Sequence, residues 1–379
     1  MHHIDLPALR LTCREVNDNV LDTFAKTHFS TFAILVHHED SLRTLLALAR
    51  HERIARAVRR LVFCFETIVA DDPDYDTCIS NGPTEPSPPP GKQALRNQKQ
   101  AEARQNRLRK RNLDLQLLTQ AFTAFAGAGK KLEVEVTPMD RGPMKPPYKP
   151  WGAKTLWSAC EQTPFALHDD DRELFRAIEQ GRVIVDKLNV WHGGFSNTLV
   201  ELNWRHKLYK AIRFPFNNLK RLEIACAWEG CDASENDVKF VAGLLQHARS
   251  LQALEIYSTH DDGQPWGCHL HSAVFDRYLQ HNVTTMRYLH AYFVTIDGQT
   301  LCEFIKRNSN FQTLRLSSVN LYCGDAVVPI TESDGRIARN LREEAIKKYF
   351  REETALEDVQ VPLCEARNGR MPSFHGTRY

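Results

Sequence analysis

A short phrase recurs along the chain, and it limits the folds that the chain can adopt more than any other feature. Its first, fourth and sixth positions are apolar, as in "LKRLEIAC" from Leu219, "LQALEIYS" from Leu251 and "FQTLRLSS" from Phe311. Alternating apolar positions predict a short strand with one buried face. The strands expected on this basis lie near Leu61, Leu132, Leu188, Leu222, Leu254, Leu289 and Leu314.

Segments with helical periodicity separate these strands. "SLRTLLALARH" from Ser41 and "DGQTLCEFIKRN" from Asp297 place apolar residues on one helical face. "DDRELFRAIEQG" from Asp170 begins with acidic residues, which suit a helix N-terminus, and ends with Gly181 as the expected C-cap. Alternating strands and helices predict parallel strands that are joined by crossover helices.

The spacing of the repeated phrase is irregular. The intervals are 32 residues from Leu222 to Leu254, 35 from there to Leu289 and 25 from there to Leu314, whereas leucine-rich units usually have about 20 to 29 residues. The expected fold class is therefore α/β, an irregular leucine-rich-repeat-like solenoid with insertions on its convex side. The alternative is an open α/β sheet whose strands are similar by chance.

Two insertions and a tail interrupt the repeat. Residues 80–111 begin with a proline cluster, which suits an exposed linker, and continue as a block of basic residues. Residues 137–152 are rich in Pro and Gly, so we expect a surface loop there. Residues 356–379 are expected to form a C-terminal tail.

The basic block from Lys92 onward has two interpretations. It carries eight Lys or Arg and one acidic residue up to Arg111 and ends in "RLRKR". A candidate nuclear-import signal consists of Arg107, Arg109, Lys110 and Arg111. The alternative, which we favour because most charge runs are simply solvated, is a solvated helix that leads into the apolar stripe of "DLQLLTQAFTAF".

No pattern in the chain supports an enzyme, a cofactor site or a metal site. "GAGKK" from Gly127 lacks the residues and the strand, loop and helix order of a phosphate-binding loop. The acids after His168 are explained by the start of a helix. The strongest metal candidate is a zinc site of unfamiliar spacing, with ligands drawn from Cys226, Cys231, Cys268, His269 and His271. We therefore expect no enzyme and no cofactor.

Composition argues against a general attraction to nucleic acid or membrane. The 49 Lys and Arg against 47 Asp and Glu give a net charge of +2, and no run of about 18 apolar residues is long enough to cross a bilayer. Ten cysteines are spread without the dense spacing of a disulfide scaffold, which favours reduced thiols. These features predict a cytoplasmic or nuclear protein with protein partners, and neither a membrane nor a nucleic-acid partner.

The stretch "LPALRLTCREVNDNVLDTFAKTHFSTF" resembles the closing part of an F-box. The residues that carry this resemblance are Leu6, Leu9, Arg10, Cys13, Arg14 and Phe24. The following stretches resemble, in order, the body of the F-box proteins with irregular leucine-rich repeats that are abundant in filamentous fungi. The resemblance implies an adaptor, in which an F-box (residues 1–29) docks on a cullin-type ubiquitin ligase and the repeats (residues 30–355) present a substrate.

Two sets of contact residues follow from these observations. The adaptor set consists of Leu6, Pro7, Leu9, Val16 and Leu21. The substrate set consists of aromatic residues that follow strands of the repeat, Trp228, Tyr257 and His260, for which local packing is the alternative role.

The opening half of an F-box has no room before Leu6. We therefore expect the chain as given to bind the ligase adaptor weakly or not at all, unless residues upstream complete the F-box. The alternatives to a ligase subunit are a stand-alone repeat protein with no ligase role and an unrecognised enzyme.

Overall fold

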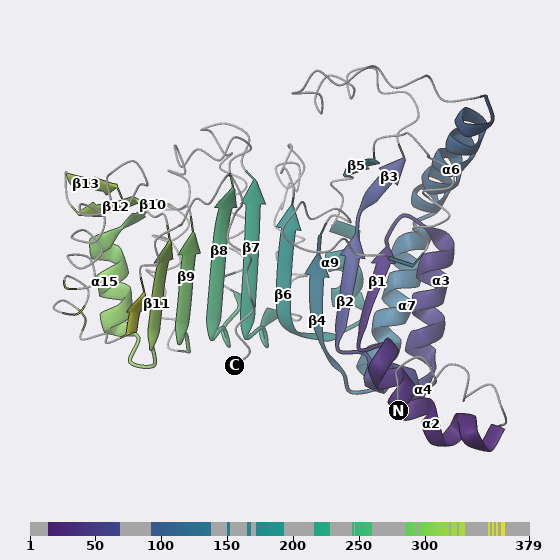
Figure 1. The fold of residues 1–379 in the computed structure, drawn as a ribbon, viewed down its shortest axis with the longest axis horizontal. Helices are drawn as coiled ribbons and strands as arrows, with labels where there is room; N and C mark the ends of the chain where they lie inside the picture. Colours follow the sequence, from purple (N-terminus) through teal and green to yellow (C-terminus); the bar gives the residue numbers. More distant parts are fainter. Residues whose placement is uncertain are drawn as a thin grey trace. The chain divides into compact units, whose positions relative to one another are not determined.

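The structure is a computed structural model that describes residues 14–68, 92–137, 150–151, 165–167, 172–192, 216–227, 245, 247–259, 285–292, 295–317, 320–323, 326–329, 348, 351, 354 and 358–360. The chain divides into two compact units. Unit 1 comprises Met1–Met139 and Tyr148–Val183, and unit 2 comprises Asp140–Pro147 and Ile184–Tyr379. Both units combine parallel strands with helices (Figure 1), so the predicted α/β class is confirmed. The division lies inside the segment 30–355 that the sequence predicts to be one repeat domain.

Three parallel strands form the main sheet in the described part of unit 1. Their order is β1 (Thr31–Leu35), β2 (Arg60–Cys64) and β4 (Lys131–Val136). A small antiparallel pair, β3 (Glu66–Ile68) and β5 (Phe165–Leu167), follows β2. The predicted strands near Leu61 and Leu132 are thus present.

Helices cover this sheet and connect its strands. The helices described in unit 1 are α2 (Arg14–His28), α3 (Glu39–Arg50), α4 (Glu52–Ala57), α6 (Lys92–Lys110), α7 (Leu113–Gly127) and α9 (Arg172–Gln180). Figure 1 shows α3 and α7 side by side, and the two helices pack against each other. The rings of Phe63 in β2 and Phe122 in α7 lie 5.9 Å apart, so the apolar stripe of α7 forms core with the sheet.

Trp151 lies beside strand β1 within unit 1. Its backbone N–H donates to the carbonyl oxygen of Ala33 at 2.9 Å, and it pairs in parallel with Ile34. Its ring lies 6.2 Å from that of Phe32. The end of the predicted 137–152 loop therefore runs beside a strand, while residues 138–149 lie outside the described part of the chain.

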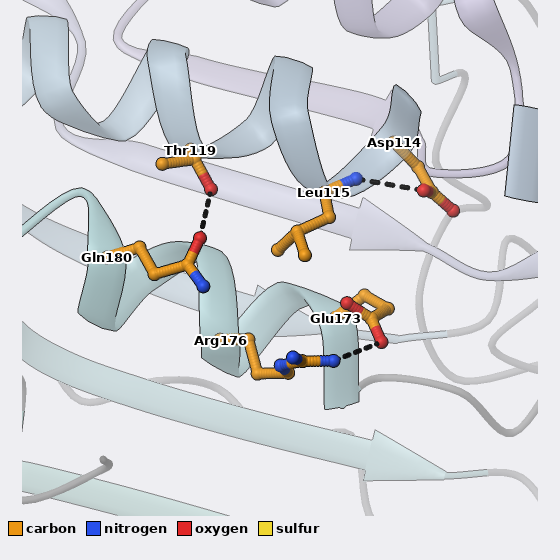
Figure 2. A network of polar contacts seen from close by, with 6 residues as sticks. All are labelled: Asp114, Leu115, Thr119, Glu173, Arg176 and Gln180. Carbon is orange, nitrogen blue, oxygen red and sulfur yellow. Dashed lines mark hydrogen bonds and ion pairs between the residues drawn. The ribbon is translucent and has the colours of Figure 1, made fainter. Parts of the chain in front are cut away.

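Helix α9 ends where it meets α7. Figure 2 shows Thr119 of α7 beside Gln180 of α9, and the Thr119 hydroxyl donates to the Gln180 side-chain oxygen at 3.2 Å. The next residue, Gly181, stands at the predicted C-cap, and its N–H donates to the Ala177 carbonyl at 2.8 Å. The left-handed backbone, however, is at Arg182, with φ 53°. A positive φ is therefore not the reason why residue 181 must be glycine.

That reason is the close approach of two backbones. A Cβ added to Gly181 would lie 2.4 Å from the Cβ of Phe122 and 3.0 Å from its carbonyl carbon. Gly181→Ala is therefore expected to lower the free energy of unfolding by about 1 to 3 kcal/mol, because α9 must move away from α7. Chemical denaturation of the purified chain measures this change.

Gly127 at the end of α7 is the matched control for this substitution. An added Cβ there meets nothing within 4 Å, so Gly127→Ala is expected to be neutral or to stabilise by up to about 1 kcal/mol. Equal effects of the two substitutions would show that α7 and α9 are not in close contact at Gly181.

His38 caps the N-terminus of α3. Its Nδ1 accepts a hydrogen bond from the Ser41 backbone N–H at 3.3 Å, and the Ser41 hydroxyl oxygen accepts one from the Leu35 N–H at 3.1 Å. These bonds join the end of β1 to the start of α3. Burial lowers the pKa of His38 below its ordinary value of 6.5; Arg104 also lowers it, while Asp40 and Glu39 oppose the shift.

The cap therefore depends on pH. Because the folded state holds His38 neutral, the unfolded chain binds the proton more readily, and the stability that His38 contributes is lost as the pH falls below 6.5. His38→Asn retains a capping side chain that does not titrate. We expect the wild type to lose stability relative to His38→Asn as the pH falls, measured by urea unfolding on either side of pH 6.5. Parallel pH curves for the two proteins would contradict this role.

Unit 2 contains the longer run of parallel strands. In sheet order these strands are β6 (Ile184–His192), β7 (Arg221–Ala227), β8 (Ala253–Thr259), β9 (Tyr288–Tyr292), β11 (Thr313–Ser317) and β14 (Asp358–Gln360). A smaller sheet has the order β10 (Thr295–Asp297), β12 (Asn320–Cys323) and β13 (Ala326–Pro329), and α15 (Gly298–Arg307) packs on it. β14 extends the main sheet into the segment predicted as the C-terminal tail.

Leucines of successive strands in unit 2 are aligned by the register. The aligned and fully buried residues are Leu188, Leu222, Leu254, Leu289 and Leu314. The five strands predicted at these leucines are therefore confirmed, and the fourth position of the repeated phrase is the centre of the core.

The turns before these strands also repeat. The phrase begins with a buried residue whose N–H donates to the carbonyl oxygen three residues earlier, at 3.0 Å for Leu219, 3.1 Å for Leu251 and 2.9 Å for Phe311. A single carbonyl then accepts two N–H groups from the next strand, as Lys220 does from Gln252 and Ala253 at 2.8 and 3.0 Å. Gln252 and Arg287 accept in the same way from the strands that follow them. The similarity between the phrases is thus one of structure as well as of sequence.

Candidate functional site

The face of the unit 2 sheet opposite the leucines carries polar side chains. Side chains alternate along a strand, so residues next to the buried leucines belong to the other face. One position after each leucine, the register aligns Asn189, Glu223, Glu255, His290 and Arg315 from five successive strands. We call these five residues the polar row.

Two acidic residues stand at the centre of the polar row. Glu223 and Glu255 are register neighbours on β7 and β8, with 14% and 26% of their side chains exposed. The Lys187 ammonium lies 3.8 Å from a Glu223 carboxylate oxygen. On the other side, His290 Nδ1 lies 3.9 Å from a Glu255 carboxylate oxygen.

His290 does not neutralise Glu255 at neutral pH. Burial lowers the pKa of His290 below its ordinary value of 6.5, and Arg315 lowers it further, whereas Glu255 opposes the shift. The imidazole is therefore mainly uncharged near pH 7.

Two buried polar atoms of the row make no hydrogen bond. They are Oδ1 of Asn189 and Nε of Arg315. Most buried polar atoms in proteins are hydrogen-bonded, so each exception requires an explanation. The row thus offers an acceptor at its β6 end and a donor at its β11 end.

The predicted substrate set is only partly placed by the structure. Tyr257 lies within β8, in register with Ala225 and Tyr292 and two residues after Glu255. Trp228 and His260 lie outside the described residues. The residues selected from the sequence were aromatic, and the polar row was missed. The fifth position of each phrase, directly after its central leucine, could have indicated this row.

The predicted adaptor set lies at the N-terminus. Leu6, Pro7 and Leu9 fall outside the described residues, and Val16 belongs to α2. Leu21 is buried in unit 1, where α2 packs against α4. An adaptor can reach Leu21 only if this packing opens, and adaptor binding stays a prediction.

The candidate import signal lies at the end of α6. Arg107 and Lys110 of the last turn and the following Arg111 are exposed. Arg109 is half-buried, and its Nε lies 3.4 Å from His37 Nδ1. The block is thus a helix, as the favoured interpretation expected, and nuclear import stays a prediction.

The segment that begins at Gly127 lacks the pattern of a phosphate-binding loop. It follows helix α7 and precedes strand β4, which is the order predicted from the sequence. Within the described residues, no three His, Cys, Asp or Glu side chains are grouped as metal ligands would be. Of the zinc candidates, Cys231, Cys268, His269 and His271 lie outside that part of the chain, and Cys226 lies in β7.

No protein-family model matches the chain, and no curated protein matches it in sequence. None of the described helices has both the length and the apolarity needed to span a bilayer.

Proposed function

We propose that the chain is a protein-recognition module whose partner binds on the polar row of unit 2. We further propose that it acts as the substrate-recognition subunit of a cullin-type ubiquitin ligase. The observation that carries the first proposal is the polar row itself, with the unbonded atoms of Asn189 and Arg315 at its two ends.

A repeat architecture supports this proposal. In unit 2, successive strands align their leucines and repeat the same turn hydrogen bonds, as expected for an irregular leucine-rich-repeat-like solenoid. In such folds each unit buries its apolar side against the next, and the other side of the strands offers a surface that runs across several units.

The ligase role rests on the F-box resemblance of the N-terminal stretch. The described part of that stretch consists of helix α2 and the start of β1. Helix α2 packs against α4, and its Leu21 and Ala25 are buried. A helical segment joined to a repeat body is the arrangement that the resemblance implies. Under this proposal the polar row holds the substrate and the N-terminal segment contacts the adaptor.

Proximity labelling tests both proposals in one experiment. A biotin-ligase fusion of the full chain is compared with two variants, Glu223→Lys with Glu255→Lys, and Trp228→Ala with Tyr257→Ala and His260→Ala. We expect both variants to lose the same small set of labelled proteins, since reversed charge and lost aromatic surface both weaken an interface. The chain as given is expected to label the ligase adaptor weakly or not at all, whereas versions of the three fusions extended upstream to complete the F-box should label it equally.

The matched control is Glu39→Lys with Glu52→Lys, which makes the same charge change at exposed helical positions of unit 1. Circular dichroism and thermal unfolding confirm that each variant is folded. Unchanged labelling by both face variants would contradict recognition on the polar row. Absence of the adaptor from the sets labelled by the extended fusions would contradict the ligase role alone.

A further inference from the structure

We propose that one side of helix α6 binds the phosphate backbone of a DNA duplex. This side carries five exposed cations, which we call the cationic face: Arg96, Arg104, Arg107, Lys110 and Arg111. At about 100° per residue these positions lie within an arc of about 120° around the helix axis, and they span about 22 Å along it. The chain as a whole is almost neutral, with a net charge of +2, so the attraction is local to α6.

Helix α6 is held in place by its opposite side. Leu108 is buried, and α6 packs against α7 and β3, while Figure 1 shows that it extends beyond the end of α7. Arg109 is half-buried, and its Nε lies 3.4 Å from His37 Nδ1. The Arg111 N–H donates to the Arg107 carbonyl at 3.2 Å, so the helical backbone continues to the last cation. The cationic face therefore has one fixed orientation within unit 1.

The cationic face is not balanced by acidic residues of the chain. Among the described residues, none forms a hydrogen bond or an ion pair with any of its five side chains. By contrast, Arg43 in α3 and Arg56 in α4 are each paired with the glutamate four positions before them. Like charges three or four residues apart, such as Arg107 with Lys110 and Arg111, destabilise a helix. An anion bound over the face would relieve this repulsion.

The residue types on α6 favour nucleic acid over a lipid or protein partner. The other exposed positions in the described part of the helix are Lys99, Gln100, Ala103 and Asn106. A helix that binds a membrane surface needs an apolar face, and a protein interface usually has aromatic anchors at its centre. Protein–DNA interfaces are polar and strongly positive, and Arg, Lys, Asn and Gln side chains donate to phosphate oxygens.

The shape of α6 favours a DNA duplex over other nucleic acids. Single strands bind by stacking their bases on aromatic side chains, and α6 has no aromatic residue between Lys92 and Lys110. The major groove of B-form DNA is about 12 Å wide and admits an α-helix, whereas that of an RNA duplex is deep and narrow. Arg104 and Lys110, at the two edges of the cationic face, would then contact the phosphates of opposite strands.

Fluorescence anisotropy of a labelled DNA duplex of about 20 base pairs tests this binding with the full chain. We expect a dissociation constant of about 10⁻⁴ to 10⁻⁶ M at physiological salt. It should rise about 10²-fold between about 50 and 200 mM salt, because about four or five phosphate contacts each release a counterion. Failure of the duplex to bind at about 50 mM salt would overturn the inference and would leave partner recognition in unit 2 unaffected.

Replacing four cations tests the face directly. The face variant combines Arg96→Gln, Arg107→Gln, Lys110→Gln and Arg111→Gln, which keep a high helix propensity. It should bind at least about tenfold more weakly, and the slope of log affinity against log salt should become shallower by about 3 to 4.

The matched control removes the same charge from exposed positions of α3 and α4. It combines Arg43→Gln, Arg50→Gln, Arg53→Gln and Arg56→Gln. We expect its affinity for the duplex to change less than about twofold. Circular dichroism confirms that both variants are folded. Equal weakening by the two variants would overturn the inference, because binding would then follow net charge alone.

Three further probes test the choice of a DNA duplex. They are an RNA duplex of the same length, a single-stranded oligonucleotide with the same number of phosphates and a polyglutamate peptide of the same charge. We expect each of them to bind at least about threefold more weakly than the DNA duplex. Any probe that binds as tightly as the DNA duplex would overturn the inference.

Discussion

Replacing Leu254 with alanine is expected to lower the free energy of unfolding by about 3 to 4 kcal/mol, within the range known for buried Leu→Ala substitutions. Leu254 is fully buried and lies between Leu222 and Leu289 in the register of three successive strands. The cavity left by alanine therefore touches the leucines of both neighbouring strands. Hydrogen exchange of the β7, β8 and β9 amides measures the loss in unit 2 directly.

The Leu254→Met variant distinguishes the loss of stability caused by the cavity from other effects of replacing Leu254. Methionine conserves most of the volume, so the loss should stay below about 1.5 kcal/mol. A Leu254→Ala effect as small as that of the methionine variant would show that Leu254 does not occupy a packed core.

Replacing Arg60 with alanine is expected to cost about 3 kcal/mol, the scale for breaking a buried ion pair by removing one partner. Arg60 of β2 forms an ion pair with Glu135 of β4, whose side chain is only 1% exposed. Without the guanidinium, the buried carboxylate loses its ion pair with Arg60. Chemical denaturation measures the loss.

The neighbouring arginine provides the control for this prediction. Arg59 is exposed, so Arg59→Ala should change stability by less than about 0.5 kcal/mol. Because the harm comes from the carboxylate left behind, Arg60→Met combined with Glu135→Leu should be more stable than Arg60→Ala alone. A double variant no better than the single one would refute this explanation.

The repeated phrase predicted the strands well because period-two burial is a local property. All seven leucines chosen from the sequence lie in parallel strands. The helix starting near Ser41 and the one ending before Gly181 were predicted from apolar spacing and caps, and they are α3 and α9. Apolar residues at fixed intervals allow few ways to bury them, which is why these predictions succeeded.

The candidate site was harder to predict. Glu223, Glu255 and His290 are far apart in the sequence and look like ordinary solvated residues there. Only the register shows that they form one row, because a shift of one residue in any strand would move each of them to the opposite face. The predicted aromatic residue Tyr257 lies two residues beyond Glu255 on the same strand.

By itself, the sequence determined that the chain is α/β and which leucines are buried, since strand and helix periodicity depend on neighbouring residues alone. Only the tertiary structure decided why Gly181 must lack a side chain, which buried glutamate Arg60 neutralises, and that Asn189 and Arg315 belong to one polar row. Each of these features depends on atoms brought together from distant parts of the chain. Their positions are set by strand register and by helix packing, which no local pattern specifies.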